Sequence, residues 1–111
     1  MKDKAVIVTG AAAGLGRAIA LRLAKDQYTV AVTDIDGEGA ERVAKTITDG
    51  GGAAIARSMD VADADAVETT VGELVGELGG LWGLVNNAGV GRATEFLKMT
   101  VQEWDWVQTV N

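Results

Sequence analysis

Short apolar runs recur along the chain and predict the strands of a sheet. They cover Ala5–Thr9, Thr29–Thr33, Ala53–Met59 and Leu84–Asn86. Strands that are buried on one face only would alternate apolar and polar residues, and these runs do not. Continuous apolar strands are typical of parallel sheets that are covered on both faces.

The segments between these runs carry apolar residues at helical spacing. In the first helix the apolar residues fall at i, i+3, i+4 and i+8, namely Leu15, Ala18, Ile19 and Leu23. A second stripe covers Ala40–Ile47 and a third covers Val67–Leu78. A fourth helix is predicted from Thr100, where Glu103 completes a capping box. Alternating strands and helices predict an α/β fold, a doubly wound parallel sheet of the Rossmann type with four strands and four helices.

A glycine-rich turn joins the first strand to the first helix, with the sequence TGAAAGLG at positions 9–16. Gly10 is expected to make the turn, Gly14 to admit a pyrophosphate close to the backbone, and Gly16 to let helix and strand pack. The N-terminus of the helix would then offer unpaired N–H groups to the phosphates. The alternative is a glycine-rich loop that only turns the chain.

Asp34 ends the second strand, about 20 residues after the glycine-rich turn, where dinucleotide-binding folds place an acidic residue. Its carboxylate would accept hydrogen bonds from the adenosine ribose and repel a 2′-phosphate, which favours NAD over NADP. The alternative is a solvated loop aspartate, since Asp36 is equally acidic.

Composition narrows the function classes. Without cysteine or histidine, the sequence predicts no metal site and lacks the usual general base. The net charge of −6 disfavours nucleic acid as a partner. The N-terminus lacks the long apolar segment of a signal peptide, and no run of about 18 apolar residues predicts a membrane span. We therefore expect a cytoplasmic protein.

Together, TGAAAGLG, Asp60-Val61 and Asn86-Asn87-Ala88-Gly89 resemble the short-chain dehydrogenase/reductase family, along the whole chain and in the family's order. The glycine spacing G-x-x-x-G-x-G is that of this family. The resemblance implies an oxidoreductase that transfers a hydride between NAD(H) and a small-molecule secondary alcohol or ketone.

The resemblance also implies residue roles. Asp60 would hold the adenine amino group beside the Val61 backbone, and the segment Asn86–Gly89 would line the adenosine side. For Asn87 a purely structural role, satisfying buried backbone groups, is equally open. The cofactor-binding residues predicted in this way are Gly10, Gly14, Leu15, Gly16, Asp34, Asp60, Val61, Asn86, Asn87, Ala88 and Gly89.

Asn111 corresponds to a catalytic asparagine that supports a proton relay in the family; the alternative is a solvated terminal residue. The family's serine, tyrosine and lysine have no match, because the only tyrosine is Tyr28 and the only serine is Ser58. We therefore expect residues 1–111 to be the NAD-binding portion of one domain whose C-terminal half is absent, and to be inactive in isolation. A non-catalytic nucleotide-binding module, or an interaction subunit that pairs through an exposed sheet edge, remain open.

The family resemblance also implies subunit contact through the fourth helix, and hence a homo-oligomer. Trp104 shares a face with Asn111 and is expected to pack inward. Trp106 points about 200° away on the helix. It is expected either to anchor a subunit interface, or to be exposed or covered by the absent half of the domain.

Overall fold

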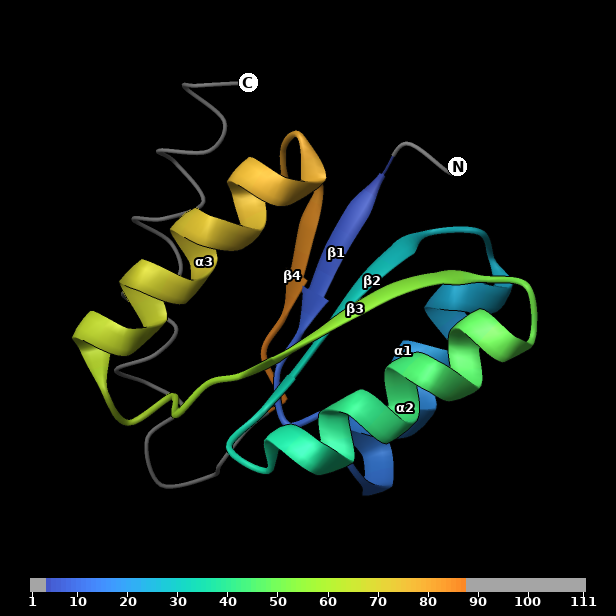
Figure 1. Cartoon of the computed structure of the whole chain (residues 1–111), viewed down its shortest axis with the longest axis horizontal. Helices are drawn as coiled ribbons and strands as arrows, with labels where there is room; N and C mark the ends of the chain where they lie inside the picture. Colours follow the sequence, from blue (N-terminus) through green and yellow to red (C-terminus); the bar gives the residue numbers. More distant parts are fainter. Residues whose placement is uncertain (1–3, 88–111) are drawn as a thin grey trace.

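The computed structural model describes residues 4–87. In this range the strands are β1 (Ala5–Val8), β2 (Thr29–Asp34), β3 (Ala53–Ser58) and β4 (Gly83–Val85). The helices in the same range are α1 (Gly14–Lys25), α2 (Gly37–Asp49) and α3 (Ala64–Leu78). The strands form one parallel sheet in the order β3-β2-β1-β4 (Figure 1). The predicted Rossmann-like fold is confirmed, while the helix predicted from Thr100 lies outside the described residues.

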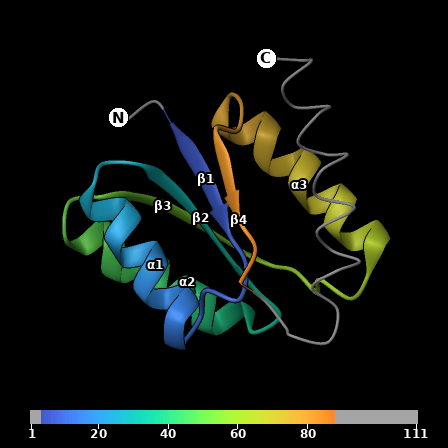
Figure 2. The same ribbon diagram turned by 180° about the vertical axis from the view of Figure 1, so that it is seen from behind.

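Helices cover both faces of the sheet. Helices α1 and α2 lie on one face and α3 on the other, as the views from the front and from behind show (Figures 1 and 2). Val6 and Val8 of β1 pack in the core beneath α1 and α2, whereas Ile7 packs in the core beneath α3. This two-sided burial explains the continuous apolar runs. At the edge of the sheet, β3 is only half-buried.

The buried face of α1 differs from the predicted one. Leu15 is 68% exposed and Ala18 is exposed, so the prediction was wrong for these two residues. It was right for Ile19 and Leu23, which are half-buried and pack against the core. Gly16 and Ala20 are the buried residues of this helix. The reason is steric: α1 lies so close to the turn after β1 that only very small residues fit in the contact, and the largest apolar residues are displaced to its flanks.

The stripes on the other two helices are confirmed. The buried residues are Ala40, Val43, Ala44 and Ile47 on α2, and Val67, Val71, Leu74 and Val75 on α3. The last residue of the third stripe, Leu78, is half-buried and packs against the same core.

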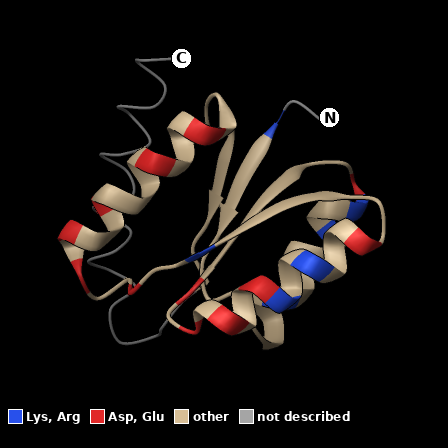
Figure 3. Ribbon diagram, viewed as in Figure 1, with Lys and Arg blue, Asp and Glu red and all other residues tan. Residues whose placement is uncertain are grey.

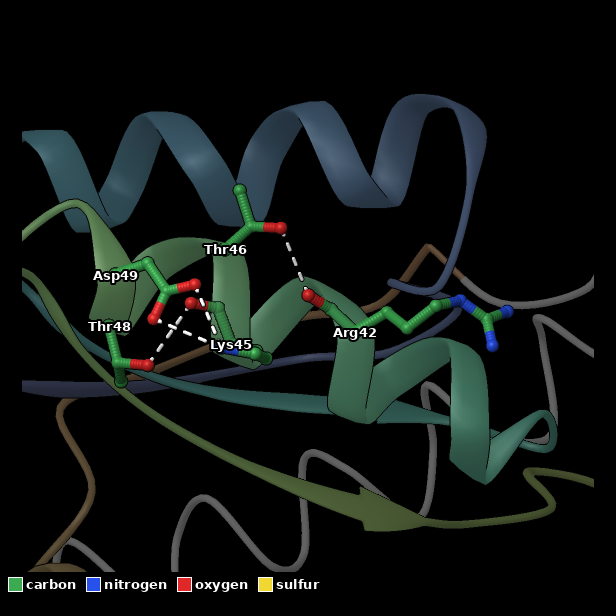
Figure 4. Close-up of polar contacts among 5 residues, drawn as sticks. All are labelled: Arg42, Lys45, Thr46, Thr48 and Asp49. Atoms are coloured by element: carbon green, nitrogen blue, oxygen red, sulfur yellow. Dashed lines mark hydrogen bonds and ion pairs between the residues drawn. The ribbon is translucent and has the colours of Figure 1, made fainter.

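The outer faces of α2 and α3 differ in charge. On α2, Lys45 Nζ lies 3.0 Å from Asp49 Oδ2, and Thr46 Oγ1 donates to the Arg42 carbonyl at 3.0 Å (Figure 4). These contacts are exposed and add little stability. Helix α3 carries acidic side chains and neither lysine nor arginine (Figure 3).

Two glycines of α3 separate the effect of helix propensity from that of backbone conformation. A Cβ on either Gly76 or Gly79 would meet no atom within 4 Å, but only Gly79, the C-cap, has a positive φ, of 72°. We expect Gly76→Ala to raise the free energy of unfolding by about 0.5–1 kcal/mol and Gly79→Ala to lower it by about 1–2 kcal/mol. Urea denaturation measures both, and shifts of the same sign would contradict this account.

Candidate functional site

The carboxyl ends of all four parallel strands lie at the same end of the sheet, called the carboxyl edge below. Val8 is in register with Val32 of β2 and with Val85 of β4, so the loops that follow these strands are neighbours. There they border a cavity of about 350 Å³. Its lining residues are Gly10, Asp34, Ile35, Met59, Asp60, Val61 and Asn87. The fold thus brings predicted site residues from four different loops to one place.

The glycines of the turn after β1 have different structural requirements. Gly10 and Gly14 have φ values of 61° and 58°, in the left-handed region that favours glycine. A Cβ on Gly14 would point into open space. A Cβ on Gly16 would lie 2.1 Å from the Gly10 carbonyl oxygen and 2.6 Å from Asn87 Nδ2, so Gly16 is required for packing.

Helix α1 begins without a side-chain cap. Its N-cap residue, Ala13, offers no side-chain acceptor. By contrast, Asp36 caps α2 by accepting from the Gly39 N–H at 2.9 Å, and Asp63 caps α3 by accepting from the Ala66 N–H at 3.1 Å. Among the helices of residues 4–87, α1 alone therefore presents its first N–H groups without an acceptor side chain, which suits an anion.

The Asp34 carboxylate contacts the glycine-rich turn. Its Oδ2 accepts from the Ala12 N–H at 2.9 Å, and its Oδ1 accepts from the Asp36 N–H at 2.9 Å. A carboxylate oxygen has a second lone pair, so both oxygens can still accept from a ligand hydroxyl. Asp36, the alternative acidic residue, does not line the cavity. It caps α2, and its Oδ2 lies 3.8 Å from Arg42 Nη2.

A buried threonine joins the ends of β1 and β4. Thr9 is 0% exposed, and its Oγ1 accepts from the Asn87 N–H at 2.9 Å. The same oxygen lies 3.3 Å from Asn86 Oδ1. Asn87 Nδ2 donates to the Gly10 carbonyl at 3.3 Å. Asn87 thus makes the backbone contacts that a structural role requires. Its role toward a ligand stays a prediction.

Sequence reasoning missed two kinds of residue at this edge. Thr9 and Thr33 are the buried polar residues there, and the Thr33 hydroxyl donates to the Val8 carbonyl at 2.9 Å. The available signal was a threonine near the end of two neighbouring apolar strands. Ile35, which is 69% exposed and lines the cavity, was signalled by its position between two aspartates.

Of the remaining predicted residues, Asp60 and Val61 line the cavity from the turn after β3. Asp60 Oδ1 accepts from the Ala62 N–H at 2.9 Å, within the turn before α3. Leu15 is an exposed residue in the first turn of α1. The predicted residues Ala88, Gly89 and Asn111, and Trp104 and Trp106 with them, lie outside the described residues.

Tyr28 is a packing residue at the opposite end of the sheet. Its ring lies 5.4 Å from that of Trp82, and Lys4 Nζ lies 4.7 Å from the Trp82 ring. A cavity of about 460 Å³ borders Tyr28 at the amino ends of β2 and β3.

Ser58, at the end of β3, donates from its hydroxyl to the Ile35 carbonyl at 3.4 Å.

Two further observations concern residues 4–87 only. They hold no group of three or more acidic, histidine or cysteine side chains arranged to bind a metal ion. None of the helices in this range is both long and apolar enough to cross a membrane.

Residues 4–111 match the family model for short chain dehydrogenases. The chain belongs to the short-chain dehydrogenase/reductase family. It is 44% identical over 109 residues to a 3-oxoacyl-[acyl-carrier-protein] reductase of Staphylococcus aureus, covering 97% of this chain and 44% of that protein. It is 37% identical over 111 residues to a D-threitol dehydrogenase of Mycolicibacterium smegmatis, covering 100% and 43%.

Solved structures of the same family resemble the fold. A hydroxysteroid dehydrogenase from Escherichia coli aligns with a TM-score of 0.76 and 36% identity, over 79% of this chain and 37% of that one. A metagenomic short-chain oxidoreductase in complex with NADP aligns with a TM-score of 0.77 and 33% identity, over 81% and 41%. The chain spans less than half the length of these family members.

Substitution of Thr9 tests whether its hydroxyl stabilises the contact between the ends of β1 and β4. In Thr9→Val the shape is kept but the Asn87 N–H loses its acceptor, which should lower the free energy of unfolding by about 1–3 kcal/mol. The control is Thr46→Val, because that hydroxyl is exposed on α2 and should matter by less than about 0.5 kcal/mol. Urea denaturation measures the free energy of unfolding of both variants. Equal losses of this free energy would show that the Thr9 hydroxyl does not stabilise the contact between β1 and β4.

Proposed function

We propose that this protein binds NAD(H) at the carboxyl edge of its sheet, as part of an oxidoreductase. One observation carries the proposal: the uncapped N-terminus of α1, with open space at Gly14, lies in the turn that the Asp34 carboxylate contacts. N–H groups that can donate to an anion and a carboxylate that can accept from hydroxyls thus lie side by side, as binding of a dinucleotide requires.

Each part of the dinucleotide has residues that fit it. The N–H groups of the first turn of α1, at Gly14, Leu15 and Gly16, suit the pyrophosphate. The Asp34 carboxylate suits the adenosine ribose hydroxyls. Asp60 and the Val61 backbone suit the adenine amino group, and the exposed Ile35 offers an apolar wall to the ring.

Asp34 favours NAD over NADP. A 2′-phosphate next to this carboxylate would be repelled, and among the described residues that line the cavity none is lysine or arginine. One family member of known structure is in complex with NADP, so the fold itself does not exclude that cofactor. The choice therefore depends on the residues at this position, and here the residue is an aspartate.

The names of the relatives support the reaction class. One acts on a 3-oxoacyl group, which is a ketone, and others on threitol or a hydroxysteroid, which are alcohols. We propose the shared chemistry for the whole protein, interconversion of a secondary alcohol and a ketone. The bound nicotinamide would supply or accept the hydride. Asn111 would belong to the catalytic group, and a cytoplasmic homo-oligomer remains our prediction.

Titration of the protein with NADH and NADPH tests the cofactor assignment. We expect NADH to bind at least about tenfold more tightly, because the phosphate and the carboxylate carry like charges. Asp34→Ala should narrow the difference, while Asp26→Ala, which removes an exposed carboxylate at the C-terminus of α1, should leave it unchanged.

Tighter binding of NADPH by the unaltered protein would overturn the preference for NAD. Failure of both nucleotides to bind would overturn the proposed function itself. Residues 1–111 alone are expected to bind NADH without turnover, so the reaction is tested on the whole protein. There, binding of NADH without turnover of any secondary alcohol would favour the non-catalytic module.

A further inference from the structure

The Asp34 carboxylate is more than a ligand for a ribose, because it already holds protein groups on both sides. Oδ2 accepts from Ala12, in the middle of the glycine-rich turn, and Oδ1 accepts from Asp36, at the start of α2. The Ala12 N–H consequently points toward Asp34. The Asp34 carboxylate thus links the glycine-rich turn to the start of α2.

A second set of contacts holds the glycine-rich turn at Ala12 and at its neighbour Ala11. A Cβ on Gly39 would lie 2.8 Å from the Ala12 Cβ and 2.4 Å from Asp36 Oδ2, so the first turn of α2 packs tightly against Ala12. Asp36 in turn accepts from the Gly39 N–H at 2.9 Å. The neighbouring Ala11 N–H donates to the Thr33 carbonyl at 3.0 Å. The turn is fixed to β2 and α2 at consecutive residues.

We propose that Asp34 is a positioning residue for the glycine-rich turn, so that the carboxylate that selects the nucleotide also sets the geometry of the anion site. This inference rests on the proposed nucleotide site for its functional consequence. Exchange of Asp34 for a neutral residue would not simply widen cofactor choice. It would also release Ala12 and weaken binding of the phosphates of either cofactor.

The first experiment needs no ligand. Hydrogen exchange of the Ala12 amide is measured by NMR in the unliganded protein and in Asp34→Asn, Asp34→Ala and the control Asp26→Asn. Loss of a hydrogen bond to a charged acceptor should speed exchange at Ala12 about tenfold in Asp34→Ala. Asp34→Asn keeps one acceptor oxygen and should show an intermediate rate, while Asp26→Asn should match the unaltered protein. Unchanged exchange at Ala12 in both Asp34 variants would overturn the proposal.

The second experiment uses inorganic pyrophosphate, which has no ribose, as the probe. Removal of a negative charge near an anion site should by itself tighten pyrophosphate binding. Release of the turn should instead weaken it, and we expect a dissociation constant at least about threefold higher in Asp34→Ala and Asp34→Asn than in Asp26→Asn. Unchanged or tighter binding would reduce Asp34 to a ribose ligand.

The two experiments separate the two claims. If pyrophosphate binds to neither the unaltered protein nor the variants, the proposed nucleotide site is wrong, and the exchange rate at Ala12 still decides whether Asp34 positions the turn. If pyrophosphate binds but its affinity and the exchange rate are insensitive to Asp34, the site stands and the positioning role is wrong.

Discussion

Helix α1 contacts the turn after β1 so closely that no side chain fits between them. A Cβ at Gly16 would overlap the Gly10 carbonyl oxygen, a backbone atom that cannot rotate away. Because of this contact, the N-terminus of α1 lies directly beyond the end of β1. Its first N–H groups are uncapped, and they face the edge where β2 and β4 also end. The anion site is a consequence of how helix and strand pack.

At the same edge, backbone N–H and C=O groups that have no partner in the parallel sheet need hydrogen bonds from side chains. Buried hydroxyls do part of this work: Thr9 accepts from the Asn87 N–H, and Thr33 donates to the Val8 carbonyl. The Asp34 carboxylate does the rest for the glycine-rich turn and for the start of α2. The hydroxyls and the carboxylate that hold the loops at this edge therefore lie next to the uncapped N–H groups of α1, which can bind a ligand. A substitution at this edge can change stability and binding together.

Periodicity predicted α2 and α3 because their buried faces carry apolar residues at helical spacing. The glycine-rich turn and Asp34 were found because motif spacing reflects local backbone geometry. The buried face of α1 could not be found in the same way. Its contact depends on Gly16 and Ala20, which hydrophobic patterns weight least. The double hydrogen bonding of Asp34 was also out of reach, since the Ala12 N–H is distant in sequence and only the parallel register brings it close.

Cavities lie at both ends of the sheet, one beside Gly10 and Asp34 and one beside Gly51 and Gly52, and we propose that the nucleotide binds at the first. Backbone amide shifts recorded by NMR during titration with NADH test this choice directly. We expect saturable shifts of the amides of Gly14, Leu15, Gly16 and Asp34, while those of Gly51 and Gly52 stay unchanged. Shifts confined to Gly51 and Gly52, with the turn after β1 unaffected, would contradict it.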